Sequence, residues 1–243
     1  MCIICTREYD INLTELLCNG CNQITEIPKE LVNLNHIECE HTHITEIPKE
    51  LVNLEKIICF NTTIVEIPKE LVKLTHLECQ DTPIIEIPKE LVKLTHLECQ
   101  DTSVIKIPNE LVNLINLGCC NTDIKEIPKE LINLKLINCS YTYIKEIPKE
   151  LVNLTYIDCY QTDIKEIPKE LVNLINVGKS LICIQDKSWI KTKDEVDKII
   201  KLQKYWKKNG YFLIRFPILW KIAEYYSKKK YAPENILKYI DLE

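Results

Sequence analysis

The chain has 243 residues, of which 46% are hydrophobic and 28% are charged, and its formal net charge is −5. This length can bury a sizeable hydrophobic core. The sequence contains no run of about 18 apolar residues, which a membrane-spanning helix requires. It does not open with a charged segment followed by a short apolar stretch, as a secretory signal does. We therefore expect a soluble protein in a reducing, intracellular compartment.

Charge is distributed unevenly along the chain. From Asp186 onward there are 14 basic and 8 acidic residues, whereas residues 1–185 contain 17 basic and 28 acidic residues. All three tryptophans and eleven of the seventeen aromatic residues also follow Asp186. This change in composition predicts a domain boundary that separates an acidic part of the chain from a basic part.

The first 33 residues contain two cysteine pairs, Cys2 with Cys5 and Cys18 with Cys21. Two Cys-x-x-Cys pairs separated by 12 residues have the spacing of a structural zinc site. The alternative is packing, because Cys18 and Cys21 occupy positions that later hold Cys and Thr in every repeat. Both side chains would then face the core, and we favour this interpretation over zinc.

Residues 1–33 are also expected to cap the repeats that follow, because the terminal units of repeat proteins must cover an open end of the core. We expect Met1 to Asp10 to act as a lid. Leu13 and Leu16 match the later repeats, but Ile24 comes one residue late. The extra residue predicts a bulge or loop at Asn22-Gln23.

Residues 34–185 repeat a unit of twenty residues. The block from Leu74 reads LTHLECQDTPIIEIPKELVK and begins again at Leu94 as LTHLECQDTSVIKIPNELVN. Leu77-Glu78-Cys79 alternates between apolar and polar side chains, which indicates a strand. The following Ile-Pro cannot lie in a central strand, because proline has no N–H group. Pro-Lys-Glu-Leu-Val suits at most one 3₁₀ or helical turn that begins at the proline.

The unit Leu-x-x-Leu/Ile-x-Cys-x-x-Thr-x-Ile resembles the leucine-rich repeat, L-x-x-L-x-L-x-x-N/C-x-L, over about residues 13–184. The resemblance implies an α/β repeat solenoid of about nine coils, with one short strand per coil in a parallel, concave sheet. Its convex side would hold short 3₁₀ or extended segments. The near-identical copies and the AT-rich codon bias are also similar to leucine-rich repeat proteins of giant DNA viruses, which would place this chain in the host cytoplasm. Amoebae or other AT-rich protists are the alternative source.

Two columns of the repeat depart from the family pattern. Cysteine replaces the third leucine, and we expect these thiols to be buried and reduced, because neighbouring side chains point the same way. Threonine replaces the asparagine, and its hydroxyl should bond backbone groups of the neighbouring coil. The two columns are Cys39, Cys59, Cys79, Cys99, Cys119, Cys139 and Cys159, and Thr42, Thr62, Thr82, Thr102, Thr122, Thr142 and Thr162.

Residues 186–243 are predicted to form a basic, aromatic-rich helical cap. Thr192 and Glu195 have the spacing of a capping box at the start of a helix. Pro217 and Pro233 can each open a further helix. We expect this cap to cover the last coil, in which Leu181–Ile184 offers a final strand.

Candidate binding residues lie in the outward columns of the concave face, which vary from repeat to repeat. One group is rich in amphipathic aromatic side chains, a composition enriched at protein interfaces. It consists of Leu136, Tyr141, Tyr143, Tyr156 and Tyr160. Parallel strands should bring Tyr141 and Tyr160 into one surface.

A second group lies nearer the N-terminus and consists of Phe60, His76, His96, Glu78 and Glu98. His76 and His96 should stand one strand spacing apart, so a metal ion or a proton-sensitive contact is geometrically possible. We favour a solvated acidic strip without metal, and we expect no cofactor.

The resemblance implies a non-enzymatic module that binds a protein partner, a host protein if the chain is viral, through the concave face. Some bacterial leucine-rich repeat proteins carry a C-terminal ubiquitin ligase with a cysteine nucleophile. Here no cysteine follows Cys183 and no histidine follows His96, so the C-terminal part lacks that nucleophile and base. The alternatives are binding of nucleic acid or an anionic membrane through the basic C-terminal helices, and a largely structural role.

Overall fold

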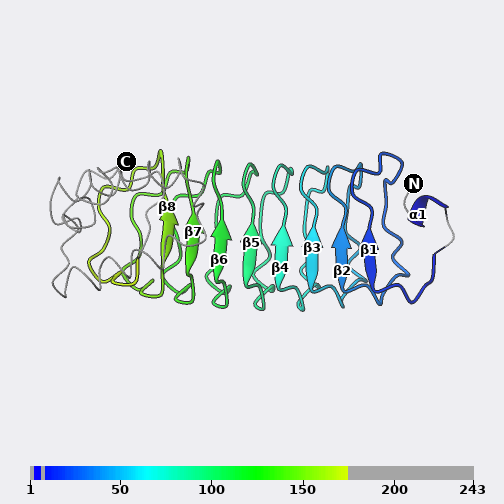
Figure 1. The fold of residues 1–243 in the computed structure, drawn as a ribbon, viewed down its shortest axis with the longest axis horizontal. Helices are drawn as coiled ribbons and strands as arrows, with labels where there is room; N and C mark the ends of the chain where they lie inside the picture. The colour runs from blue at the N-terminus through cyan, green and yellow to red at the C-terminus, as the bar shows by residue number, and fades with distance from the viewer. Residues whose placement is uncertain (1–2, 7–8, 175–243) are drawn as a thin grey trace, which may run out of the picture. The chain divides into compact units, whose positions relative to one another are not determined.

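The computed structural model describes residues 3–6 and 9–174, and within them the chain folds into a parallel β-solenoid (Figure 1). The short helix α1 (Ile3–Thr6) precedes eight strands that pair in sequence order. The strands are β1 (Glu15–Leu17), β2 (His36–Glu38), β3 (Lys56–Ile58), β4 (His76–Glu78), β5 (His96–Glu98), β6 (Asn116–Gly118), β7 (Leu136–Asn138) and β8 (Tyr156–Asp158). The predicted parallel, one-strand-per-coil architecture is confirmed. The predicted last strand and helical cap lie outside the described residues.

The register of the sheet follows the sequence period. From β2 onward each residue pairs with the residue twenty positions later, as His36 does with Lys56. Between β1 and β2 the offset is one residue longer, because Glu15 pairs with His36. The extra residue lies in a turn at Asn22-Gln23, where the Ile24 N–H donates to the Cys21 carbonyl oxygen at 3.3 Å. The predicted loop is confirmed, and the strand itself remains regular.

The core is a stack of identical layers. In the coil that begins at Leu74, the middle strand residue Leu77 and the cysteine that follows the strand are fully buried. Four further apolar residues of each coil complete its layer. In this coil the buried side chains are Leu74, Leu77, Cys79, Ile84, Ile87 and Leu91. Because each layer contacts only its neighbours, burial is spread evenly along the axis.

The segments that connect the strands run back along the opposite side of each coil, and we call the surface that they form the return face. They contain turns instead of helices: the Leu51 N–H donates to the Pro48 carbonyl oxygen at 3.1 Å, and the Leu54 N–H donates to the Leu51 carbonyl oxygen at 3.1 Å. Prolines at the same position open equivalent turns in the other described coils. The prediction that Pro-Lys-Glu-Leu-Val forms at most one turn is confirmed, and a second turn follows it from Leu51 to Leu54.

The threonine column is buried from Thr42 to Thr142, but its predicted hydrogen bonds are wrong. Thr82 Oγ1 donates to the carbonyl oxygen of Cys79 in its own coil at 2.6 Å, and the other described threonines of the column do the same at 2.6–2.8 Å. The reason is local: Asp81, which lies between Cys79 and Thr82 in the chain, has a left-handed backbone with φ of 52°. This conformation turns the hydroxyl back toward the strand that it has just left.

A different column links neighbouring coils. Asparagine side chains on the return side donate from Nδ2 to a backbone carbonyl oxygen 21 residues earlier, at 2.8–2.9 Å. They are Asn53, Asn113, Asn133, Asn153 and Asn173. The side-chain ladder expected from threonine is therefore supplied by the asparagine of the Leu-Val/Ile-Asn-Leu segment.

Replacing Thr122 with valine should lower the free energy of unfolding by about 1–3 kcal/mol, because the Cys119 carbonyl oxygen loses a buried hydrogen-bond donor. Urea unfolding of the full chain measures this loss. The matched control is Thr45→Val, the same substitution at an exposed position, which should change little. Equal effects of the two substitutions would show that the internal hydrogen bond contributes nothing.

Candidate interaction surfaces

The outward side chains of the sheet form a continuous surface, which we call the sheet face. In each strand the middle residue is buried and its neighbours point outward, as with His76 and Glu78 on either side of Leu77. A third outward column lies two residues beyond each strand, as with Phe60 and Tyr160. This surface corresponds to the predicted concave face. Both predicted groups of binding residues contribute to it.

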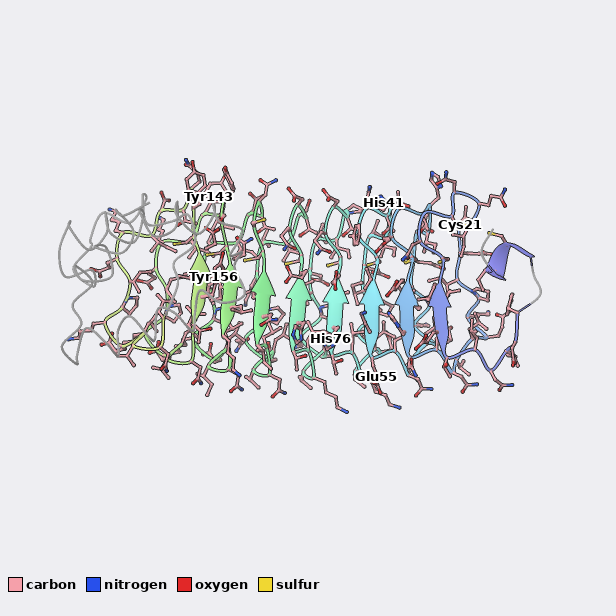
Figure 2. All side chains as sticks on the ribbon, viewed as in Figure 1. Cys21, His41, Glu55, His76, Tyr143 and Tyr156 are labelled. Atoms are coloured by element: carbon pink, nitrogen blue, oxygen red, sulfur yellow. The ribbon has the colours of Figure 1, made fainter. Side chains whose placement is uncertain are left out.

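The tyrosine cluster, which comprises Leu136, Tyr141, Tyr143, Tyr156 and Tyr160, lies over the C-terminal strands. The rings of Tyr141 and Tyr160 meet edge to face, with centroids 5.5 Å apart and an interplanar angle of 78°. Leu136 pairs directly with Tyr156 across β7 and β8. Tyr143 lies at the edge of the sheet where the strands end (Figure 2), and 57% of its surface is exposed. The predicted contact between Tyr141 and Tyr160 is confirmed.

The cluster contains one unusual backbone conformation. Tyr141 has a left-handed φ of 56°, and 56% of its surface is exposed. The same position carries His, Asn, Asp or Gln in the other described repeats, and Gly20 in the first coil. Asn, Asp, His and Gly occur most often in this region, and the conformation is costly for a bulky residue. Its N–H still donates to the Tyr160 carbonyl oxygen at 2.8 Å.

An aromatic pair with the same arrangement lies near the other end of the sheet. His41 also has a left-handed backbone, and its ring meets Phe60 edge to face at 5.2 Å and 85°. The Nδ1 atom of His41 lies 2.7 Å from Asn61 Nδ2. Phe60 is therefore partly covered by His41, and the two rings form a smaller aromatic surface at the edge where β3 ends.

His76 and His96 stack face to face, with ring centroids 4.2 Å apart and an interplanar angle of 9°. Thr95 Oγ1 uses its only hydrogen to donate to the Thr75 carbonyl oxygen at 3.0 Å. His96 Nδ1, which lies 2.9 Å from the same Oγ1, must therefore be the donor of that second bond. The Thr75 hydroxyl and His76 repeat the arrangement. Each neutral ring thus carries its proton on Nδ1 and keeps Nε2 as an acceptor.

Proximity of the two rings opposes a second positive charge. Burial lowers the pKa of His76, and the neighbouring His96 and then Lys56 lower it further. His36, in the second coil, has a carboxylate as its neighbour: its Nε2 lies 3.1 Å from Glu38 Oε1. The orientation of the two groups does not meet the criteria for a hydrogen bond. The stacked pair is therefore better suited to hydrogen-bond acceptance than to an ion pair.

Glu78 and Glu98 lie directly opposite each other on β4 and β5. Burial raises the pKa of Glu98, the hydrogen bond donated by Gln100 Nε2 to its Oε2 opposes this shift, and the charge of Glu78 raises the pKa further. Gly118 on the next strand makes room for this arrangement, because a side chain there would collide with Glu98 and Gln100. The glycine was a visible signal in the sequence, but the sequence did not show which side chains fill its space.

The N-terminal cysteines are partly brought together. Cys5 Sγ and Cys21 Sγ lie 3.4 Å apart. Cys18 is buried and its thiol donates to the Glu38 carbonyl oxygen at 3.4 Å, so it packs against the second coil. Cys2 lies outside the described residues. Within the part of the chain that the structure describes, no group of three or more metal-ligating side chains is assembled.

The cysteine column lies behind the sheet face and is buried as predicted. Its members from Cys39 to Cys139 are free thiols. Burial is the main cause that raises the pKa of each of these six thiols, and the pKa of Cys59 reaches about 12. A thiol that stays protonated and buried is a poor nucleophile and a poor metal ligand. The column therefore contributes packing and no reactive site.

A second variable column lies on the return face, outside the concave face to which the predicted binding residues belong. It reads Thr25, Thr45, Val65, Ile85, Ile105, Lys125, Lys145 and Lys165. The three apolar members are more than half exposed. This column was visible in the sequence, but its position on an open surface follows only from the path of the coil.

Comparison with known proteins supports the fold. No known protein family and no curated protein matches the sequence. Among solved structures, the leucine-rich repeat protein LIC12759 of Leptospira interrogans has a TM-score of 0.56 at 24% identity, covering 65% of this chain and 47% of that chain. The internalin inlF of Listeria monocytogenes has a TM-score of 0.53 at 16% identity, with coverages of 68% and 60%. The PEPR1–AtPEP1 structure has a TM-score of 0.52 at 20% identity, with coverages of 63% and 26%.

These similarities identify the fold as that of leucine-rich repeat proteins. In each comparison the chain spans less than two thirds of the other protein's length. Within residues 3–6 and 9–174, no helix has the length and hydrophobicity that crossing a bilayer demands.

Proposed function

We propose that this protein is a non-enzymatic interaction module that binds a protein partner through its sheet face. The tyrosine cluster carries the proposal, because aromatic side chains from neighbouring coils form one exposed surface on a regular sheet. Tyrosine offers a large contact area and a polar hydroxyl, and it is enriched at protein interfaces. The sheet holds these rings at defined spacings, so little ordering is needed when a partner binds.

The backbone of Tyr141 supports the same surface. A tyrosine with a left-handed φ costs stability that an asparagine or glycine would not cost at this turn. The conformation holds the ring against Tyr160, which extends the aromatic surface across two coils. Local strain at an exposed aromatic residue is typical of a binding site, in which shape takes precedence over the stability of the turn.

We further propose that the N-terminal half of the sheet face forms the polar part of the interface. Glu78 and Glu98 carry negative charge there, and His76 and His96 present hydrogen-bond acceptors beside them. Such groups mainly set the association rate and the choice of partner. Phe60 adds an apolar contact at the edge of the same region.

The alternative that basic helices bind nucleic acid or an anionic membrane concerns residues 186–243, which lie outside the described residues. Binding of RNA or anionic liposomes to the full chain, measured across a range of salt concentrations, tests it. Steep salt dependence would favour this alternative.

Changing Tyr156 and Tyr160 together to alanine should weaken binding of the protein partner about thirtyfold, because buried interface aromatics commonly contribute about 2 kcal/mol. The partner is first identified by photocrosslinking from a probe placed at Tyr156, and its affinity is then measured by calorimetry. The melting temperature should stay unchanged, since neither side chain belongs to the buried core.

The matched control is Lys149→Ala. Lys149 is exposed on the return face, in the segment that connects β7 to β8. Its affinity should equal that of the unaltered protein. If Lys149→Ala weakens binding and the tyrosine changes do not, the interface lies on the other surface and the proposal is wrong.

A further inference from the structure

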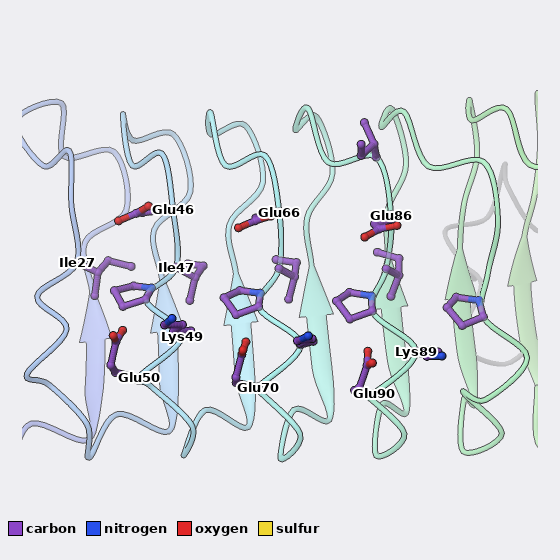
Figure 3. Close-up of a pocket in the computed structure, with 18 of the residues that line it drawn as sticks. Ile27, Glu46, Ile47, Lys49, Glu50, Glu66, Glu70, Glu86, Lys89 and Glu90 are labelled. Carbon is purple, nitrogen blue, oxygen red and sulfur yellow. The ribbon is translucent and has the colours of Figure 1, made fainter.

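A groove of about 1620 Å³ runs along the return face over the first five coils, away from the sheet face (Figure 3). Its floor is apolar and is formed by the Ile-Pro pairs at the same position of successive repeats, such as Ile47-Pro48 and Ile67-Pro68. Glutamates line both sides of this floor. One row contains Glu26, Glu46, Glu66 and Glu86, and the other contains Glu30, Glu50, Glu70, Glu90 and Glu110. We call this surface the return groove.

The return groove carries a net negative charge, because its glutamates outnumber its lysines. Nine glutamates and five lysines line it. Among the described residues none of these glutamates has a basic group within ion-pair distance, since the ion pairs found there involve only Glu38. Glu30 accepts a hydrogen bond from the Tyr9 hydroxyl at 3.1 Å. An external cation can therefore bind most of these carboxylates without displacing an internal partner.

Exposed apolar side chains stand beside the first acidic row in three coils, and two of them, Ile85 and Ile105, line the groove. Val65, Ile85 and Ile105 stand at one position of three successive coils, and 55%, 63% and 65% of their surfaces are exposed. The same position holds threonine in the coils before and lysine in the coils after. Because contiguous exposed apolar groups mark interaction sites, Ile85 and Ile105 add an apolar contact on the outer side of the first acidic row. Its occupant should combine cationic and apolar groups.

The spacing of the coils restricts the backbone of such an occupant. Neighbouring strands are about 4.8 Å apart, and each coil adds one glutamate to a row. A polyproline II segment rises about 3.1 Å per residue, so every third residue faces the same way at intervals of about 9.3 Å. This interval matches two coils. A β-strand repeats at about 6.7 Å, which does not match the row.

We propose that the return groove binds an extended basic segment of another protein in the polyproline II conformation, with lysine or arginine at every third position. The cations contact glutamates of alternate coils, and the intervening apolar residues lie on the Ile-Pro floor and against Ile85. Lys106 stands where the first row would continue, so the acidic row ends there and limits the length of the bound segment. This binding is independent of the sheet face and of the function proposed for it.

The test uses the full chain and a fluorescent peptide of four Lys-Pro-Pro repeats, with affinity measured by anisotropy. The double substitution Glu66→Gln with Glu86→Gln should weaken binding about tenfold, because two charge pairs are lost. The control is Glu126→Gln with Glu146→Gln, which makes the same charge change at the same repeat position outside the groove. It should alter affinity less than twofold.

A second peptide tests the spacing, because it has the same composition but groups its four lysines at one end. Binding at least fivefold weaker than that of the regular peptide supports the proposed conformation. Equal binding of the two peptides, or equal losses from the two pairs of substitutions, would mean that only nonspecific attraction to an acidic surface operates, and the proposal would be wrong. A loss of peptide binding on changing Tyr156 and Tyr160 to alanine would also overturn it, by placing the peptide on the sheet face.

Discussion

Above about pH 9, the free energy of unfolding should fall by up to about 8 kcal/mol for each pH unit, and the fold should be lost within one to two units. The cause is the cysteine column. Six of its thiols have a raised pKa in the folded protein, mainly because burial disfavours the thiolate. In the unfolded chain the same thiols lose their protons near pH 8.5.

The direction follows from proton binding. Between the pKa of about 8.5 in the unfolded chain and the pKa of about 12 for folded Cys59, the folded state holds a proton that the unfolded state has released. Stability is therefore fully present below the unfolded pKa and is lost as pH rises toward the folded pKa. Each such thiol contributes a slope of about 1.4 kcal/mol per pH unit, and the six slopes add when urea unfolds the whole array in one transition.

Urea unfolding at several pH values between 7.5 and 10.5, with a reductant present, measures the slope. The variant Cys99→Ala with Cys119→Ala should be less stable at neutral pH because of lost packing, but its slope should be smaller by about one third. The slope separates titration from packing, because a cavity lowers stability equally at every pH. A stability that stays constant from pH 8 to pH 10 would contradict the effect of burial on these thiols.

Replacing Leu97 with alanine should lower the free energy of unfolding by about 2–5 kcal/mol. Leu97 is the middle residue of β5, is fully buried, and is paired in register with Leu77 and Leu117. Its removal leaves a cavity between two layers that neighbouring coils cannot fill, because the β-sheet spacing holds them apart. In a linear array the loss weakens the interfaces on both sides.

Urea unfolding again provides the measurement, and hydrogen exchange locates the weakened coils. The control is Val92→Ala, an apolar-to-alanine change at an exposed position of the preceding coil, which should alter stability by less than about 0.5 kcal/mol. Exchange should accelerate most in β4, β5 and β6. Uniform acceleration in all eight strands would show that the array unfolds only as a whole, and equal losses from the two variants would rule out the cavity as the cause.

Much of this architecture could be predicted because one pattern determines it repeatedly. A shift of one residue in a strand would move Leu77 from the core to the surface, so the alternation around it determines the register. The delayed Ile24 located the extra turn for the same reason. Register also predicted that Tyr141 would lie beside Tyr160 and His76 beside His96, and both contacts are present.

The sequence could not determine the direction of a hydroxyl or the openness of a surface. Thr82 bonds its own coil because the backbone at Asp81 is left-handed, and nothing in the residue types alone distinguishes that carbonyl from one on the next coil.

The sequence by itself thus determined the coil, its period and its buried columns, because burial of apolar side chains depends on local alternation that is repeated without interruption. Only the tertiary structure decided that Glu46 and Glu50 flank an open groove, because Ile47 between them turns into the core while Pro48 redirects the chain. Stacking then aligns these groups across coils that are twenty residues apart. A surface of this kind depends on the path of the chain in space, which the order of residues within one repeat does not show.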